Sequence, residues 1–310
     1  MSSLQLVPDE ETTYLVLYES ERYSQVYPEY KKFHDFLDRS EIPYVSLYHP
    51  DYPMSPWIRD WLSVLHYKTE SGYGFVYFDF DHLYEDKGFM KFYEPFSDEY
   101  FPKIANILGL EVKTFPDFSL DGGSLVYDSS NVFVSNRILG VNSWLPFSDL
   151  FCDFLHGLGL DVNIRFVPDW GDLIGHIDSI YRFVDDKLFV AYSPDLDTPG
   201  YYKTVLFGNK VYFLFPSLGE GPLNQAFYDY LGFVVIGNKI LLPSYDDVVL
   251  NDFAYKFLST VLPDYKIIPL FPSICNALAR LGGTIHCVVS QFAHIQDTGI
   301  YGKRINLKEL

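Results

Sequence analysis

The feature that most constrains the fold of this chain is a recurring unit of helix, short strand, proline and polar motif. The strand of each unit is rich in β-branched or aromatic residues, and the polar motif follows the proline. Four units run from FHDFLDRSE to WIRD, from YFPKIANILG to DGGS, from PFSDLFCDFLHGLG to GHID and from FAYKFLSTVLP to GGTIHC. Glycines after the helices and prolines after the strands are typical stop signals. Each unit is therefore predicted to be a β/α module of an α/β fold.

Two further segments indicate hairpins between these modules. In SLVYDSSNVFVSN a turn is expected at residues 128–131, and in IYRFVDDKLFVAY at Asp185 and Asp186, because Asp, Ser and Asn favour turn conformations. The repeat periods are irregular, which excludes a solenoid of near-identical units. If the modules surround a pseudo-symmetry axis, the four motifs meet in one central pocket. The alternative is plain alternation of helix and strand, with the motifs as ordinary turns.

The chain is long enough to bury a large core, and we expect a single domain over residues 1–310. Hydrophobic residues make up 48% of the 310 residues, aromatic residues are spread along the whole length, and no linker or low-complexity segment divides the halves. The formal net charge of −18 repels phosphate backbones and attracts cations. Nucleic acid is therefore not expected as a partner, and a cationic ligand is consistent with the charge, as is simple solubility.

The termini and cysteines favour a cytoplasmic protein that does not enter the membrane. The N-terminal MSSLQLVPDEETTYLVLYES lacks the basic residues of a signal peptide, and no apolar run reaches membrane-spanning length. Three cysteines without framework spacing indicate a reducing compartment. Metal motifs such as CxxC and HExxH are missing, as are GxxxxGK, GxGxxG and GxSxG. We therefore predict cysteine chemistry with no cofactor and no metal.

Two carboxylates suit the recognition of a guanidinium group. A guanidinium is planar, permanently charged and forked, so two carboxylates can grip its edges. Asp60 of WIRD and Asp178 of GHID are the candidates, although an Asp after Arg59 is more often a surface ion pair or helix cap. Trp57 strengthens the interpretation, because an aromatic wall suits a cation and an alkyl stem.

GHID and DGGS together supply an imidazole and a third carboxylate. His176 and Asp178 are two residues apart, so in an extended segment both side chains would point to the same face. Asp121 could orient the His176 ring as in a triad. The paired glycines after Asp121 allow unusual backbone angles and a thin pocket wall. Taken alone, His176 would be a structural histidine and DGGS a tight turn.

Cys287 is the candidate nucleophile. It is expected on a strand after two glycines, with the neighbouring His286 pointing to the opposite face. A bound guanidinium or a protonated His176 would stabilise its thiolate. The other interpretation is an ordinary buried cysteine. Cys152, on an amphipathic helix, and Cys275, in a helical turn, are expected to be structural.

The ordered set WIRD, DGGS, GHID and GGTIHC resembles the guanidino-group-modifying enzyme superfamily, and within it the agmatine deiminase and bacterial-type peptidylarginine deiminase family. The matching motifs extend from Trp57 to Gln291. The resemblance implies a pseudo-fivefold α/β propeller of ββαβ modules, the pentein-like fold. It also implies that Cys287 attacks the guanidinium carbon, that His176 serves as acid and then as base, and that a thiouronium intermediate forms.

The resemblance also assigns the carboxylates and marks two departures. Asp60 and Asp178 would hold the guanidinium, and Asp121 would pair with His176 where agmatine deiminases have Glu. The first motif continues as RDWLS in place of the RDxGP usual in agmatine deiminases. Arg137, in FVSNRIL, stands where relatives that handle amino acids often have an arginine, which could pair with a substrate carboxylate. An ion pair without a substrate role is an equal alternative for Arg137.

The predicted activity is thus deimination of agmatine, arginine or peptidyl-arginine to a ureido product and ammonia, in the first case on a route to putrescine. Two alternatives stay open. In an amidinotransferase an amine would resolve the thiouronium in place of water, which requires water to be excluded. A non-catalytic binder of cationic ligands would not need the thiol. The expected partner is a small guanidino substrate or an arginine-containing peptide, and a homo-oligomer is left open.

Overall fold

The structure is a computed structural model that describes residues 4–21, 26–50, 57–62, 65–79, 96–143, 146–169, 175–191, 203–206, 209–214, 217–218, 227–293 and 298–310. Five three-stranded units recur in it, each an antiparallel pair followed by a parallel third strand. Their strands are β4 (Leu65–Thr69), β5 (Gly72–Asp79) and β6 (Glu111–Ser119); β7 (Leu125–Tyr127), β8 (Asn131–Ser135) and β9 (Asn163–Val167); β10 (Tyr181–Val184), β11 (Lys187–Ala191) and β13 (Asn209–Leu214); β16 (Val234–Ile236), β17 (Lys239–Leu242) and β18 (Lys266–Pro269); and β19 (Val289–Phe292), β2 (Tyr14–Glu19) and β3 (Tyr44–Tyr48). This fivefold repetition agrees with the pseudo-fivefold propeller that the family resemblance implied.

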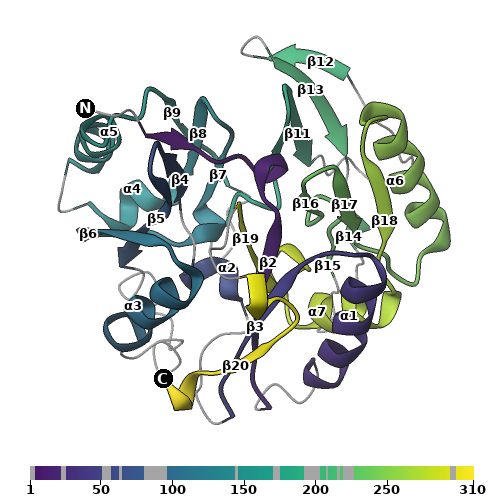
Figure 1. The fold of residues 1–310 in the computed structure, drawn as a ribbon. Coiled ribbons are helices and arrows are strands. Elements are labelled where there is room, and N and C mark those ends of the chain that lie inside the picture. Colours follow the sequence, from purple (N-terminus) through teal and green to yellow (C-terminus); the bar gives the residue numbers. More distant parts are fainter. Residues whose placement is uncertain are drawn as a thin grey trace.

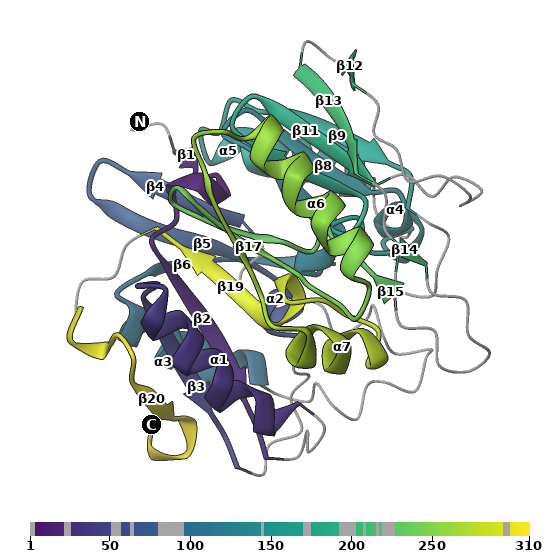
Figure 2. The same ribbon diagram turned by 90° about the vertical axis from the view of Figure 1, so that its right-hand side faces the viewer.

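Helices connect the parallel strands and cover the outside of the molecule (Figure 1). Four of them are α1 (Tyr27–Arg39), α3 (Phe96–Leu108), α5 (Phe147–Gly157) and α6 (Val248–Val261). Between β11 and β13 the described residues contain no helix, and β12 (Lys203–Leu206) pairs with β13 instead. Figure 2 shows α6 lying along β17, and Figure 1 shows α6 beside β18. The four units found in the sequence are therefore confirmed, and the unit of β10, β11 and β13 is the one that was missed.

Smaller elements complete the fold. Two strands lie at sheet edges, β1 (Gln5–Leu6) beside β4 and β20 (Arg304–Asn306) beside β3. Strands β14 (Ser217–Leu218) and β15 (Phe227–Tyr228) form a separate pair. Short helices are α2 (Ile58–Trp61), α4 (Arg137–Val141) and α7 (Pro272–Arg280). Single 3₁₀ turns are η1 (Asp9–Glu11), η5 (Gly122–Ser124), η6 (His286–Val288), η7 (Thr298–Ile300) and η8 (Leu307–Glu309).

The local sequence explains the helices and turns. In α1 the residues Tyr30, Phe33 and Leu37 recur at helical spacing, and all three are buried. In α6 the Asp247 side chain caps the helix by accepting a hydrogen bond of 2.9 Å from the backbone N–H of Leu250. Both predicted hairpins are confirmed, as β7–β8 and β10–β11. Asp185 takes the left-handed conformation at φ 50°, which Asp tolerates in a tight turn.

Strand β2, near the N-terminus, pairs with a strand near the C-terminus and is buried on both faces. It pairs with β19 near the C-terminus and with β3, so the last unit is closed by residues far apart in sequence. Tyr14 and Tyr18 enter one hydrophobic cluster, and Leu15 and Leu17 enter another. A strand buried on both faces carries a continuous apolar run, and β2 reads YLVLYE.

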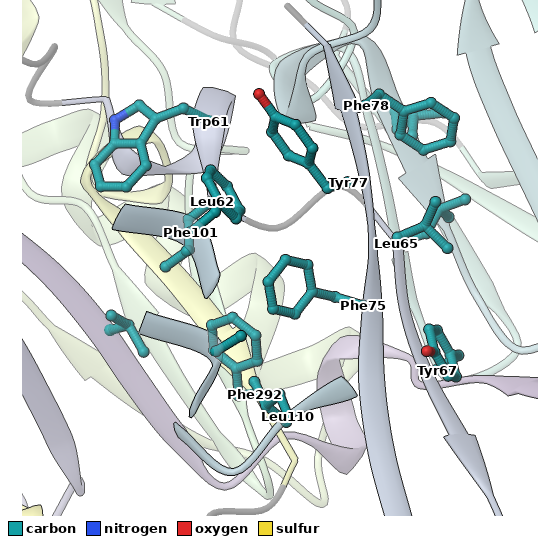
Figure 3. Close-up of a cluster of buried hydrophobic side chains, with 14 of the residues drawn as sticks. Trp61, Leu62, Leu65, Tyr67, Phe75, Tyr77, Phe78, Phe101, Leu110 and Phe292 are labelled. Atoms are coloured by element: carbon teal, nitrogen blue, oxygen red, sulfur yellow. The ribbon is translucent and has the colours of Figure 1, made fainter. Parts of the chain in front are cut away.

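Aromatic side chains from different units fill the core between the sheets (Figure 3). Phe292 of β19 stacks on Tyr14, with ring centroids 5.7 Å apart, and meets Phe75 of β5 edge to face at 6.1 Å. Phe292 is fully buried, which contributes about 1.5–3 kcal/mol of hydrophobic free energy. This packing fixes β19, and with it the segment just before it, against the N-terminal half. Among the helices of the described ranges, none has the length and apolarity needed to cross a bilayer.

Candidate active site

The first motif forms the short helix α2, which places Asp60 in the interior. Asp60 is only 4% exposed. Trp61 is fully buried and meets Tyr18 edge to face at 5.4 Å, while the Arg59 guanidinium donates from Nη2 to the Gln291 side-chain oxygen. These anchors on both sides of Asp60 fix the direction in which the carboxylate points. Trp61 is therefore a core residue.

The second motif needs both of its glycines because other groups occupy the space of a side chain. A Cβ at Gly122 would lie 2.0 Å from the backbone oxygen of Arg59, and one at Gly123 would lie 2.3 Å from Nδ1 of His176. Asp121 precedes these glycines as the N-cap of η5. Its Oδ1 accepts a 2.8 Å hydrogen bond from the Ser124 backbone N–H, and the side chain is fully buried. DGGS thus contacts α2 on one side and the GHID segment on the other.

The third motif is attached to the second by backbone hydrogen bonds. The Gly123 carbonyl accepts from the N–H groups of Ile177, at 2.8 Å, and Asp178, at 3.2 Å. His176 then lies with Nε2 3.0 Å from Oδ2 of Asp121 and Nδ1 4.0 Å from Oδ1 of Asp60. Residues 175–177 have no regular secondary structure and a turn begins at Asp178, so the segment is not part of a strand. The loop still brings His176 and Asp178 into the same buried group of side chains.

The carboxylates around His176 favour its protonated form. Burial disfavours the imidazolium, but the negative charges of Asp121 and Asp60 outweigh burial and raise the pKa of His176 to about 10. Burial, with the repulsion of Asp121 and Asp178, raises the pKa of Asp60 to about 8, although His176 opposes this. Near neutral pH His176 is a cation paired with Asp121, and it can supply a proton to a leaving group.

Asp178 has different neighbours and a different ionisation. Its Oδ2 accepts a 2.8 Å hydrogen bond from Nδ1 of His286, which lies next to Cys287 in the chain. Burial alone would raise the pKa of Asp178, but His286 and the nearby cations hold it below the ordinary value. The expectation that His286 points away from the site is wrong. The reason is that η6 is a 3₁₀ turn, so the alternation of a strand does not apply.

Cys287 lies in this 3₁₀ turn, immediately before β19, and not within the strand as expected. It is partly exposed, and its sulfur accepts a 3.5 Å hydrogen bond from the backbone N–H of Thr284. Burial of the thiol, together with the charges of Asp178 and Asp60, raises the pKa of Cys287 above the usual range. The thiol is therefore protonated at neutral pH.

The other two cysteines lie in helices, as expected. Cys275 is buried in α7, where its sulfur accepts a 3.4 Å hydrogen bond from the Ser244 N–H, and Cys152 lies in α5. Among the described residues no group of three or more His, Cys, Asp and Glu side chains could hold a metal ion.

The last two predicted site residues each lie against a glycine of a motif. A Cβ at Gly283 would be 2.5 Å from the Trp57 ring, so Trp57 covers the backbone that leads to Cys287. A Cβ at Gly175 would be 2.4 Å from Cδ of Arg137 and 2.8 Å from a carboxylate oxygen of Asp169. Arg137 therefore crosses the chain one residue before His176, with an acidic side chain beside it.

Two polar residues of this region, Arg182 and Asp229, were missed by sequence reasoning. Arg182 of β10 is 3% exposed and its Nη1 lies 2.5 Å from Nε2 of His286. Asp229 accepts hydrogen bonds from the N–H groups of Leu231 and Gly232, and burial, with repulsion by Asp178, raises its pKa to about 7. The only sequence signal was a charged residue within an apolar strand for Arg182 and a carboxylate ahead of Tyr-Leu-Gly for Asp229.

Comparisons with known proteins agree with the resemblance drawn from the motifs. The family model for Porphyromonas-type peptidyl-arginine deiminase matches residues 215–292, which include Cys287. None of the curated protein sequences compared with the chain matches it. Agmatine deiminase of C. jejuni is similar in structure, with a TM-score of 0.73 and 19% identity over 96% of this chain and 98% of that chain. The corresponding values for agmatine deiminase of Enterococcus faecalis are 0.72 and 18%, over 94% and 96%.

A more distant likeness extends to a second enzyme type with the same fold. A dimethylarginine dimethylaminohydrolase gives a TM-score of 0.56 at 10% identity, over 91% of this chain and all of that chain. These likenesses confirm the pseudo-fivefold α/β propeller. The predicted resemblance to the agmatine deiminase and peptidylarginine deiminase family is confirmed as well.

Proposed function

We propose that this protein is a cysteine-dependent guanidine deiminase, which converts a guanidinium-containing substrate and water into a ureido product and ammonia. The observation that carries the proposal is the meeting of four distant motifs around His176. Its ring contacts Asp121 at 3.0 Å and approaches Asp60 at 4.0 Å, and the fourth motif joins the group through the 2.8 Å hydrogen bond between Asp178 and His286, the neighbour of Cys287. A thiol, an imidazolium and paired carboxylates are the groups that this chemistry needs.

The charge balance of the group favours a cationic substrate. Asp60 and Asp178 are the candidates to grip the guanidinium at its edges. The pKa values of Asp60 and of the Cys287 thiol are both raised by burial and by neighbouring negative charge. A bound guanidinium would offset that charge and lower both values, so the substrate itself would promote formation of the thiolate.

The proposed reaction has two halves that share His176. When the substrate cation binds, the Cys287 thiol releases its proton to solvent. The thiolate adds to the guanidinium carbon, a C–N bond breaks, and ammonia leaves with a proton from the His176 imidazolium. The resulting thiouronium carries the amidino carbon on sulfur. His176, now neutral, takes a proton from water, whose oxygen adds to this carbon. As the C–S bond breaks, the hydroxyl proton of the adduct passes to the sulfur, which releases the neutral ureido product and restores the Cys287 thiol.

Arg137 bears on whether the substrate carries a carboxylate in addition to its guanidinium group. Arg137 lies across Gly175, next to His176, and a carboxylate of a substrate such as arginine or a C-terminal arginine could pair with it. The alternative is that Asp169, at the same glycine, is the partner of Arg137 and that the substrate is agmatine, which has no carboxylate. An Arg137→Met variant separates the two. It should weaken use of arginine and spare agmatine in the first case, and alter neither preference in the second.

Ammonia release tests the proposal. The panel contains agmatine, free arginine, a peptide with C-terminal arginine and a peptide with internal arginine, each with the wild type and with Cys287→Ser. Release by the wild type alone is the expected result. If no member of the panel releases ammonia, the hydrolase proposal fails for these substrates. Added amines then test an amidinotransferase, and guanidinium binding without turnover tests a binder.

Further parts of the proposal concern the setting of the enzyme. We propose that residues 1–310 form one catalytic domain that works in the cytoplasm without a cofactor, with no nucleic acid or membrane partner. The acidic charge of −18 supports a cationic ligand. With agmatine as the substrate, the reaction would lie on a route to putrescine.

A further inference from the structure

A chain of three buried side chains passes behind the proposed guanidinium site. Nδ1 of His286 lies 2.8 Å from Oδ2 of Asp178, and Nε2 of the same ring lies 2.5 Å from Nη1 of Arg182. The exposed fractions are 3% for His286, 5% for Asp178 and 3% for Arg182. None of these contacts involves the groups that the proposed reaction assigns to bond making or breaking.

The chemistry of Arg182 decides the protonation of His286. A guanidinium carries only donors and stays charged in proteins, so Nε2 of His286 must present a lone pair to it. The single ring proton is then on Nδ1, which donates to the Asp178 carboxylate. Burial and the positive charges of Arg182 and Arg59 agree with this, because they hold the pKa of His286 well below its ordinary value.

Arg182 is itself held by several contacts, so it cannot turn away from the ring easily. Its Nη2 donates to the backbone oxygens of Asp178, at 3.2 Å, and Leu231, at 3.4 Å. Its Nη1 also lies 3.4 Å from Oδ2 of Asp9, which belongs to η1 near the N-terminus. The guanidinium therefore connects β10, η1 and the loop before β16 to the back of the site.

We propose that His286 is a positioning residue, held by Arg182 in its neutral Nδ1–H tautomer so that it fixes Asp178 as a permanent carboxylate anchor for the substrate guanidinium. The part that concerns the substrate rests on the proposed function. The hydrogen bond takes one lone pair of Oδ2 and leaves Oδ1 for the substrate. A binding carboxylate that is held by such a hydrogen bond keeps its orientation when the site is empty.

This arrangement gives the two substrate carboxylates different tasks. Asp178 receives the His286 hydrogen bond and stays ionised. Asp60, 4.0 Å from the nearest imidazole nitrogen and close to Asp121 and Asp178, holds its proton more strongly. Asp178 would thus attract the substrate, and Asp60 would complete the grip once the substrate charge is present.

Nitrogen NMR of histidine-labelled protein tests the tautomer without any need for turnover. The chain has 8 histidines, and the His286 signals are identified by their loss in His286→Asn. The expected result is a protonated Nδ1 and an unprotonated Nε2 over the neutral pH range. A proton on Nε2, or on both nitrogens, would overturn the proposal. Arg182→Met should allow the ring to exchange between tautomers, and an unchanged spectrum would also contradict it.

Two substitutions of His286 test the positioning role. Asn keeps an N–H donor at the place of Nδ1. The pKa of Asp178 and the KM should therefore stay close to the wild-type values, with the pKa followed by carboxyl carbon NMR. Leu removes the donor, so the pKa of Asp178 should rise and the KM should increase by about 10- to 150-fold, as for one lost hydrogen bond to a charged group. An equal effect of the two variants would show a packing role and refute the proposal.

His66 provides the matched control. It is also a buried histidine, 1% exposed, whose ring nitrogens have no hydrogen-bond partner within the described residues. His66→Leu should leave Asp178 and the KM unchanged. If the wild type turns over none of the guanidino compounds, the proposed function fails. The tautomer and the pKa of Asp178 still decide whether His286 holds this carboxylate.

Discussion

Gly123→Ala is the substitution whose consequence the structure specifies most closely. The added Cβ would lie 2.3 Å from Nδ1, 2.5 Å from Cγ and 2.6 Å from Cε1 of the His176 ring. Because ordinary contact between such atoms needs about 3.5 Å, the ring must retreat by about 1 Å. His176 is a side chain and can move, so we expect the fold to survive and the site to be displaced.

The displacement would separate the ring from its carboxylate. The hydrogen bond between Nε2 and Oδ2 of Asp121 is 3.0 Å long, and a ring that shifts by about 1 Å loses the distance and angle of this bond. A hydrogen bond to a charged group is worth about 1.5–3 kcal/mol, and a misplacement of about 1 Å can cost about 100-fold in rate. We therefore expect kcat/KM for ammonia release to fall by about 100-fold or more, and the pKa of His176 to fall from about 10 towards its ordinary value.

Two other glycines serve as comparisons for this variant. A Cβ at Gly157, in α5, meets nothing within 4 Å, so Gly157→Ala should leave the rate unchanged and stabilise its helix by up to about 1 kcal/mol. A Cβ at Gly122 meets the backbone of Arg59 at 2.0 Å, so Gly122→Ala should lower the unfolding temperature more than Gly123→Ala does. A kcat/KM of Gly123→Ala equal to that of the wild type would refute the reasoning, because the position of the His176 ring would then not depend on its contact with Gly123.

Three further outcomes follow from other buried contacts. The pKa of His176 is raised to about 10, so its protonation stabilises the fold fully below about pH 6.5, and this stabilisation is lost as the pH rises through about 10. In urea unfolding, Asp121→Asn should reduce the fall of the unfolding free energy over this pH range. Gln291→Leu leaves the Arg59 guanidinium without this acceptor and should lower the free energy of unfolding by about 1.5–3 kcal/mol; an unchanged urea midpoint would contradict this. Burial would raise the pKa of Glu19, but an imidazole and a hydroxyl hold it below the ordinary value, so its contribution is present above about pH 4.5 and is lost in acid. Glu19→Gln should therefore be less stable at neutral pH and lose less stability in acid, and parallel curves would count against this.

The elements that could be predicted from sequence are those with short-range signals. One example is the unit of helix α5, its glycine ending and strand β9. The sequence predicts this unit and the structure contains it, because capping and strand patterns are local. The β10–β11 hairpin was found from its two aspartates for the same reason. The unit built on this hairpin was missed as a unit because the described residues between β11 and β13 include no helix that could mark it.

The site shows the same division. Cys287, His176, Asp121, Asp60 and Asp178 could be named as candidates because each lies in a short polar motif within an apolar chain. The partner of Asp178 could not be named. The alternation of a strand predicts that His286 lies on the far face, and only the 3₁₀ turn of η6 brings its ring to the carboxylate.

The sequence by itself determined the modules, the candidate chemistry and the acidic charge, since helix caps, strand patterns and polar motifs act over a few residues. The tertiary structure decided that these motifs meet. The Asp121–His176 contact spans 55 positions, the His286–Asp178 contact 108 and the Arg182–His286 contact 104. Such contacts, and the pKa values that burial and neighbouring charges give to Asp60 and His176, depend on how separate units pack around one centre, which no local pattern records.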